Sequence, residues 1–222
     1  MIQRHVIAAT GLVREARMLA GAGIVAIAGG GDRARLEAEI EAACAGATGI
    51  ISIGLGGALD EGLKPGDWVI GSQVGTIETD REWTNRLLSK LPGARLGAVA
   101  GSDVMVVDAA AKARLHAATG ALVVDMESHI AARVAGRRGL PFVVARTISD
   151  GADRALPRAA QAGMRPDGGM DVGAVIASLA QRPWELPALV RTGLEAEAAF
   201  GALLRGRQLL GAALMGPGAD LR

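Results

Sequence analysis

Short apolar runs alternate along the chain with stretches whose apolar residues recur at helical spacing. The runs His5–Ala9 and Ile24–Ala28 have the length of buried strands. In the segment Asp32–Cys44, Leu36 and Ile40 are spaced as on one face of a helix. The same criteria predict further strands at Gly49–Ile53, Trp68–Val74, Arg95–Ala100 and Pro141–Ile148, and further helices at Val13–Leu19, Arg81–Lys90, Asp108–Thr119, Val172–Leu179 and Pro187–Met215.

This alternation predicts one α/β domain over residues 1–222, with a parallel or mixed sheet between helices. No internal repeat, linker or shift of composition divides the chain. The Gly-, Pro- and Asp-rich segment Ala159–Gly173 is predicted to be a mobile loop. An apolar helical extension is predicted over about 186–216. Burial against the sheet is the favoured explanation for its apolar residues, and contact with a lipid or a protein partner is the alternative.

Composition narrows the range of partners. The chain has two Phe, three Trp, no Tyr and a formal net charge of +1, so neither a stacking platform nor a basic patch for nucleic acid is expected. The three histidines are isolated, and Cys44 is the single cysteine, so no metal site and no internal disulfide are predicted. No apolar stretch reaches the ~20 residues of a membrane span. We expect a cytoplasmic protein, with any membrane association arising through its substrate.

Two glycine clusters follow predicted strands. The first, Gly29–Ala34, has the Gly-x-Gly-x-x-Ala spacing of a dinucleotide site but lacks the acidic residue that such a site needs about 20 positions later. Gly31 and Arg33 are therefore candidates for a phosphate, carboxylate or ribose contact, and a tight turn is the alternative. The second cluster, Gly54–Ala58, is predicted to be a turn whose glycines let a ligand or a neighbouring backbone approach closely. It lacks the Lys-Ser/Thr ending of a P-loop.

Acidic residues stand where predicted strands meet helices. Glu15 follows the first strand, Asp125 and Glu127 precede a helix, and Asp150 ends an apolar strand. Strand exits of this kind border ligand clefts in α/β proteins. The simpler explanation is that they are solvated charges in first turns and at strand ends.

These residues lie in motifs that resemble the purine nucleoside phosphorylase and methylthioadenosine/S-adenosylhomocysteine nucleosidase superfamily. The most specific block is VVDMES followed by LPFVVARTISDGAD, and GLGGALDEGLKPGDWVIGS supports it. The resemblance runs from about Val6 to Ala180. Within the superfamily, AGGGDRARL, DMESHIAARVA and the leucine-rich C-terminal part are most similar to the hopanoid-associated phosphorylases. The resemblance implies a three-layer nucleoside phosphorylase-like fold, with a central mixed sheet flanked by helices.

The resemblance also implies roles for individual residues. Asp150 would protonate the purine at N7, and Glu15 would activate the attacking water. Met126 and Glu127 would hold the ribose. Further substrate contacts are expected from Asp125, Met105, Ser149, Gly56 and Gly57.

Two positions depart from the family pattern. Met105 stands where the family has a ring-stacking Phe, and Leu55 where a hydroxyl often serves the nucleophile pocket. Leu55 offers no hydroxyl group to bind phosphate, which counts against tight phosphate binding. Hydrolysis is therefore narrowly favoured over phosphorolysis. Phosphate, held by Gly31 and Arg33, remains an alternative co-substrate, and no other cofactor is expected.

The function expected from the resemblance is release of adenine from an adenine nucleoside, namely adenosylhopane in hopanoid biosynthesis. One alternative is a methylthioadenosine/S-adenosylhomocysteine nucleosidase with a small polar substrate. Another is a nucleoside-binding module without catalysis. Family members generally form homo-oligomers, so a homodimer is expected.

Overall fold

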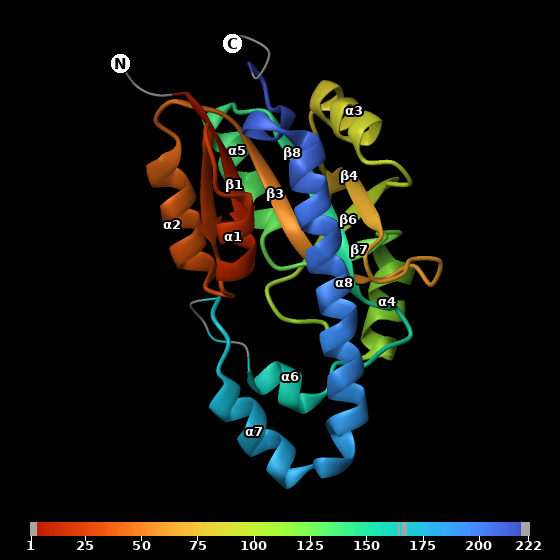
Figure 1. Cartoon of the computed structure of the whole chain (residues 1–222). Helices are drawn as coiled ribbons and strands as arrows, with labels where there is room; N and C mark the ends of the chain where they lie inside the picture. Colours follow the sequence, from red (N-terminus) through yellow and green to blue (C-terminus); the bar gives the residue numbers. More distant parts are fainter. Residues whose placement is uncertain (1–3, 164, 166–167, 219–222) are drawn as a thin grey trace.

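A mixed eight-stranded sheet lies at the centre of the protein, as the computed structural model, which describes residues 4–163, 165 and 168–218, shows (Figure 1). Its strands are β1 (His5–Thr10), β2 (Ile24–Ala28), β3 (Ala47–Ala58), β4 (Trp68–Val74), β5 (Ile77–Glu78), β6 (Arg95–Gly101), β7 (Val123–Asp125) and β8 (Phe142–Asp150).

The strand pairings close part of the sheet on itself. β3 is parallel to β8 and antiparallel to β7, and β8 is antiparallel to β4. β6 is parallel to both β4 and β7, which completes the ring β3–β8–β4–β6–β7. β1 and β2 continue the sheet outward from β3. In this ring Gly57 of β3 pairs with both Val124 of β7 and Asp150 of β8, so the two acidic segments meet at one end of β3.

Helices cover both faces of the sheet (Figure 1). Alternate residues of β1 point to opposite faces: Ile7 belongs to the core beneath α2 and α5, and Val6 to the core beneath α1, α3 and α8. The predicted three-layer fold with a mixed central sheet is thus confirmed. The helices are α1 (Val13–Leu19), α2 (Arg33–Ala43), α3 (Arg81–Lys90), α4 (Ala109–Thr119), α5 (Ser128–Arg138), α6 (Arg158–Ala162), α7 (Val172–Gln181) and α8 (Leu186–Leu210), with 3-10 turns η1 (Pro183–Glu185) and η2 (Ala212–Met215).

Two predicted segments have a different structure. Gly54–Ala58 is not a turn but the last part of β3, because it pairs with β7 and β8. The predicted loop Ala159–Gly173 contains α6 and the beginning of α7, although residues 164, 166 and 167 of it lie outside the described part.

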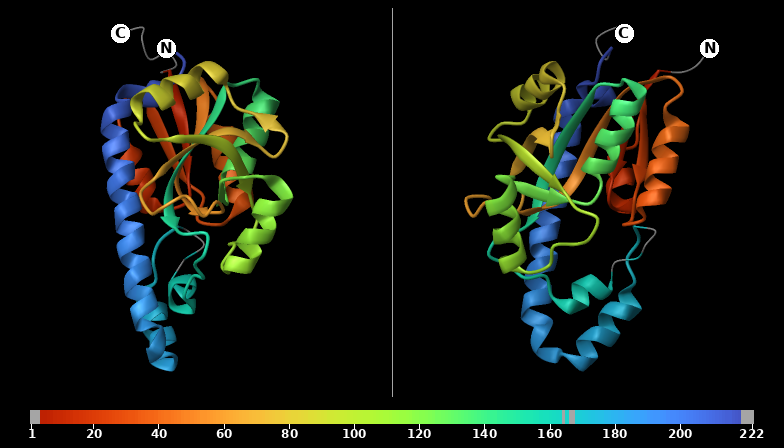
Figure 2. Two further views of the ribbon diagram at one scale, coloured as in Figure 1. Left: turned by 90° about the vertical axis from the view of Figure 1, so that its right-hand side faces the viewer. Right: turned by 180° about the vertical axis from the view of Figure 1, so that it is seen from behind.

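The C-terminal apolar residues divide between burial and exposure. The second half of α8 is packed on the sheet, with Phe200, Leu203 and Leu210 buried. The first half continues beyond the sheet and joins α6 and α7 at the end of the molecule opposite the chain termini (Figures 1 and 2). Burial against the sheet therefore explains only part of this segment. Among the described residues, no helix is long and apolar enough to cross a membrane.

Candidate active site

Glu15, in the first turn of α1, is buried and held by backbone amides. Its Oε2 accepts hydrogen bonds from the N–H groups of Gly11 (2.8 Å) and Leu12 (2.6 Å), and its Oε1 accepts one from Leu55 of β3 (2.6 Å). The residue is 1% exposed, so the alternative of a solvated first-turn carboxylate is wrong for Glu15. A Cβ on Gly54 would lie 2.7 Å from Glu15 Oε1, which explains glycine at this position.

Glu127 lies close to Glu15. A Cβ on Gly11 would be 3.0 Å from Glu127 Oε1 and 3.5 Å from Glu15 Oε2, so both carboxyl groups adjoin this glycine. Glu127 is the residue before α5, and the end of β7 delivers it. The two acidic residues, taken from distant parts of the sequence, thus share one buried space.

Arg146, in the middle of β8, is fully buried and binds this acidic cluster. Its Nε lies 2.8 Å from Asp125 Oδ2, and its Nη2 lies 3.3 Å from Glu127 Oε2. Its guanidinium also donates to Ser52 Oγ (2.5 Å) and to the carbonyl of Leu55 (3.2 Å). A buried cation of this kind is stable only with partners. The sequence analysis missed Arg146, although a charged residue inside an otherwise apolar strand is a detectable signal.

Asp125 has a structural place in the cluster. Besides its ion pair with Arg146, its Oδ1 accepts from the backbone N–H groups of Glu127 (2.9 Å) and Ser128 (2.7 Å). Both oxygens are engaged inside the protein. These contacts join Asp125 to Arg146 and to the start of α5, and its predicted contact with a substrate stays a prediction.

The electrostatics of the cluster favour a protonated Glu127. Burial raises the pKa of Glu127 to about 8; the nearby Arg146 opposes this shift, while Asp125 and Glu15 add to it. Burial also raises the pKa of Glu15, against the lowering effect of its hydrogen bonds from Leu55 and Leu12. Three carboxyl groups share one guanidinium, so ionising all of them in a space closed to water is unfavourable.

Asp150, at the end of β8, is paired with a lysine that the sequence analysis did not identify. Lys112 of α4 is fully buried, and its Nζ donates to Asp150 Oδ2, to the carbonyl of Gly151 (2.8 Å) and to that of Arg154 (3.1 Å). Ser149 Oγ donates to Asp150 Oδ1 (2.6 Å). A lysine in an alanine-rich helix ordinarily lies on the surface, so the sequence gives no signal for this contact.

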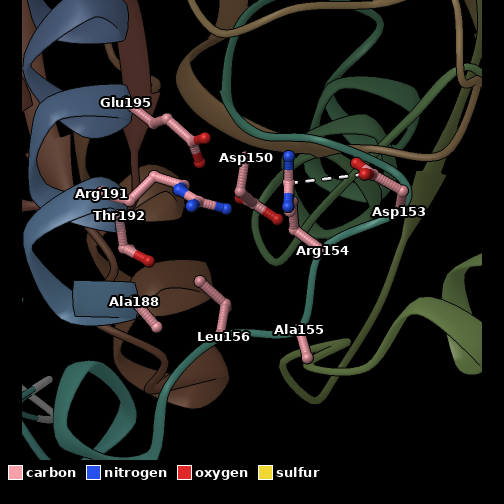
Figure 3. A pocket seen from close by; sticks show the side chains of 9 residues that line it. All are labelled: Asp150, Asp153, Arg154, Ala155, Leu156, Ala188, Arg191, Thr192 and Glu195. Atoms are coloured by element: carbon pink, nitrogen blue, oxygen red, sulfur yellow. Dashed lines mark ion pairs between the residues drawn. The ribbon is translucent and has the colours of Figure 1, made fainter. Parts of the chain in front are cut away.

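A cavity of about 210 Å³ opens beside Asp150 (Figure 3). It lies between the first half of α8 and the segment after β8, with Arg191 and Arg154 extended toward it from opposite sides. Six of its nine lining residues are charged or polar, and three are apolar. The lining residues are Asp150, Asp153, Arg154, Ala155, Leu156, Ala188, Arg191, Thr192 and Glu195.

The predicted glycine contacts have different outcomes. A Cβ on Gly57 would lie 3.3 Å from Asp150 Oδ2, and one on Gly31 would lie 3.7 Å from Met126 Cε. These two glycines therefore adjoin the candidate residues. A Cβ on Gly56 would meet Val123 Cγ2 at 2.7 Å, so glycine there permits the close packing of β3 on β7, and its predicted substrate contact stays a prediction.

The remaining candidates are less engaged in the cluster. Met126 and Met105 are half-buried. Arg33 is exposed and donates to Asp103 Oδ2 (2.5 Å), so the structure pairs the predicted phosphate ligand with a carboxylate. No group of three or more His, Cys, Asp and Glu side chains suited to a metal occurs within the described residues.

The chain belongs to the phosphorylase superfamily, whose sequence profile matches residues 8–181. Over 56 residues it is 48% identical to the 5′-methylthioadenosine/S-adenosylhomocysteine nucleosidase of Treponema pallidum; this match spans 25% of the chain and 21% of that relative.

Solved structures share the fold over most of the chain. The 5′-methylthioadenosine/S-adenosylhomocysteine nucleosidase of Helicobacter pylori superposes with a TM-score of 0.61 at 17% identity, covering 82% of this chain and 100% of that one. The futalosine hydrolase of the same organism gives a TM-score of 0.60 at 17% identity, covering 80% and 98%. The nucleosidase of Colwellia psychrerythraea, solved with adenine, gives 0.58 at 16% identity, covering 81% and 96%.

Proposed function

We propose that the protein hydrolyses the N-glycosidic bond of an adenine nucleoside and releases adenine. The observation that carries this proposal is the position of Glu15: it is buried, held by three backbone amides and placed beside Glu127. Each oxygen of a carboxylate can accept more than one hydrogen bond, so Oε1 can accept a further one from a water molecule. In its ionised form, which its three backbone N–H donors favour against the opposing effect of burial, Glu15 would accept the proton of that water as the water oxygen attacks the ribosyl carbon.

The leaving base requires a proton donor on the other side of the bond. Asp150 is the candidate, with Ser149 and Lys112 bound to its two oxygens. A proton passed to N7 lets adenine leave as a neutral base, and the bond electrons depart with it. Lys112 already donates to Asp150 Oδ2, so the proton for N7 would come from the Lys112 ammonium by way of Asp150, and the lysine would be left as a neutral amine.

The sugar would lie between these groups, against Met126 and Glu127. The ribosyl carbon becomes positively charged as the bond breaks, and carboxylates close to it stabilise that charge. Glu127, with a pKa of about 8, can donate a hydrogen bond to a ribose hydroxyl as well as accept one. This fixes the sugar relative to Glu15 and the attacking water.

Water fits this arrangement better than phosphate. Arg33 is paired with Asp103, and Arg146 is buried against Asp125 and Glu127. A phosphate dianion beside Glu15 would meet further negative charge, and Arg146 is already bound to Asp125 and Glu127. The structure thus adds support to hydrolysis with Glu15 as the base.

For the substrate, we propose adenosylhopane, because of the resemblance to the hopanoid-associated phosphorylases and because the C-terminal helices expose apolar residues near the site. The alternative is a methylthioadenosine/S-adenosylhomocysteine nucleosidase, favoured by the similarity to the Treponema pallidum enzyme and by the polar lining of the cavity.

Turnover of two substrate classes separates these proposals. The purified protein is incubated with methylthioadenosine and with an adenosine that carries a long alkyl 5′ substituent, and free adenine is measured. Faster release from the alkyl compound supports the lipid substrate, and faster release from methylthioadenosine supports the alternative. Tight binding of both with no adenine released would contradict an enzymatic function and favour a binding module.

A further inference from the structure

The carboxylate of Asp103, in the segment between β6 and α4, binds the first turns of two helices. Its Oδ2 accepts a hydrogen bond from Arg33 Nη1 at the start of α2 (2.5 Å), and its Oδ1 is hydrogen-bonded to His129 Nε2 at the start of α5 (2.9 Å). The other ring nitrogen of His129, Nδ1, is buried and has no hydrogen-bond partner among the described residues. A Cβ on Gly101 would lie 2.4 Å from His129 Cβ, so the end of β6 packs against the same side chain. Asp103 therefore provides the hydrogen bond that orients this ring.

This contact differs from the other ion pairs of α2 and α5. Farther along the two helices the acids are on α2 and the arginines on α5, namely Glu37 and Glu41 with Arg133, Arg137 and Arg138. In the first turns α2 has Arg33 and α5 has His129, and the carboxylate that binds them comes from Asp103, outside both helices. The contact at Asp103 therefore fixes the segment after β6 to the helix ends, besides joining the helices.

The segment that contains Asp103, residues 102–107, begins beside the proposed ribose site. Ser102 N–H donates to the carbonyl of Asp125 (2.8 Å), two residues before Glu127. The Asp103 contact with the start of α5 follows directly, and Glu127 is the residue before that helix. Two successive residues thus hold this end of the segment against the part of the chain that carries Glu127.

The other end of the segment lies beside the proposed base site. The carbonyl of Val107 accepts a hydrogen bond from Leu156 N–H (2.8 Å), and Leu156 lines the cavity beside Asp150. The segment 102–107 therefore runs from the ribose side of the candidate site to the base side. Met105 lies between its two fixed ends and is half-buried.

We infer that Asp103 is a positioning residue for the nucleoside and that it acts through Met105. The inference rests on the proposed function, in which the base lies beside Asp150 and the sugar against Glu127. A nucleoside bound in this way extends between the two places that the segment 102–107 connects, so Met105 would pack against it. Without the Asp103 carboxylate the segment is held less firmly and binds the nucleoside less tightly.

Asp103→Asn tests the inference by separating binding from chemistry. The amide keeps one acceptor oxygen but loses the negative charge that Arg33 and His129 share. Binding is measured by calorimetry with an adenosine C-nucleoside, whose carbon–carbon glycosidic bond cannot be hydrolysed, and turnover is measured with the cleavable nucleoside. We expect Kd and KM to rise about tenfold while kcat stays within about twofold, because a binding contact is lost rather than one made only in the transition state.

Glu41→Gln is the matched control. Glu41 lies on α2 and binds Arg137 and Arg138 of α5, so its loss removes ion pairs between the same two helices but leaves the segment 102–107 untouched. This variant should keep the Kd and KM of the unmodified chain. An equal increase in Glu41→Gln would overturn the inference, since loss of helix packing would then explain the effect of Asp103→Asn.

A double-mutant cycle with Met105→Ala shows whether Asp103 acts through this methionine. If it does, Asp103→Asn should raise Kd much less in a chain that already carries Met105→Ala. A merely structural role of Asp103 would leave the two effects additive. Additive effects on Kd, or an unchanged Kd in Asp103→Asn, would overturn the inference.

Hydrogen exchange of the free protein separates this inference from the proposed reaction. The amides of residues 102–107 should exchange faster in Asp103→Asn than in Glu41→Gln or the unmodified chain, whether or not adenine is released. Nucleoside binding that Asp103→Asn weakens, with no adenine released by the unmodified chain, would contradict hydrolysis and support the positioning role. Unchanged exchange of the segment in Asp103→Asn, or no binding of the C-nucleoside by the unmodified chain, would overturn the positioning role.

Discussion

The Lys112 ammonium directs all three of its N–H bonds to one strand end, binding the Asp150 carboxylate and the carbonyls of Gly151 and Arg154. Both side chains are buried, with exposures of 0% for Lys112 and 8% for Asp150. The lysine therefore joins α4 to the end of β8 at the residue proposed to protonate the base. The ion pair can be tested through the stability of Lys112 variants and through the turnover of Asp150 variants.

Loss of Lys112 should destabilise the fold. Lys112→Met leaves Asp150 as a buried charge without its partner, which costs about 3–5 kcal/mol. The double variant Lys112→Met/Asp150→Asn should recover much of that loss, since neither charge remains. Urea denaturation of the two single variants and the double variant measures this coupling. Simple addition of the two single effects would contradict a direct ion pair.

Asp150→Asn should retain the fold and lose adenine release. The amide keeps the size of the carboxyl group but cannot donate an acidic proton to N7, so turnover should fall by roughly 10²–10⁴. Steady-state measurement of adenine, with circular dichroism to confirm folding, checks this. Glu39→Gln, an exposed carboxylate of α2, serves as the control and should retain full turnover. Full turnover by Asp150→Asn would remove Asp150 from the mechanism.

Gly54→Ala should disable the site through Glu15. The added methyl group would lie 2.7 Å from Glu15 Oε1, so the carboxylate must move away from the amides that hold it. We expect turnover to fall at least about tenfold, and stability to fall by about 1–3 kcal/mol. Gly136→Ala is the matched control, because nothing lies within 4 Å of its added Cβ, and in helix α5 it should be neutral or stabilising. Equal turnover in both variants would contradict a role for the position of Glu15.

Stability should depend on pH through Glu127. Its pKa rises from an ordinary 4.5 to about 8 on folding, so the folded protein holds a proton that the unfolded chain releases. The stabilisation is complete below the lower value and is lost as pH rises through the higher one. The melting temperature should therefore fall between pH 4.5 and 8 and level off above. Glu127→Gln should flatten this slope, with Glu15 accounting for what remains. An unchanged slope would contradict a buried, protonated Glu127.

The sequence was sufficient for most of the fold, because the elements with clear periodicity are those that pack on the sheet. The predicted helix Val13–Leu19 and strand Trp68–Val74 have the observed boundaries. Gly54–Ala58 was wrongly predicted as a turn, since glycines there accommodate Glu15 and neighbouring strands rather than ending the strand. The segment Ala159–Gly173 was predicted to be a loop from its Gly, Pro and Asp content, but most of α6 lies in it. Composition does not encode the tertiary packing of this helix.

The site could be predicted only in part. Glu15, Glu127 and Asp150 stand at strand exits, and the structure brings Glu15 and Glu127 together. Their cationic partners depend on which elements become neighbours in the folded chain. Arg146 reaches the acids because β8 lies beside β3, and Lys112 reaches Asp150 from a helix that looks like a surface helix in sequence.

Hydrolysis of an adenine nucleoside is tested by the identity of the sugar product. The protein is incubated with an adenine nucleoside, with and without inorganic phosphate, and the products are identified by mass. Hydrolysis predicts free adenine and an unphosphorylated sugar, at a rate that phosphate does not change. A ribosyl phosphate as the product, formed only when phosphate is present, would contradict it.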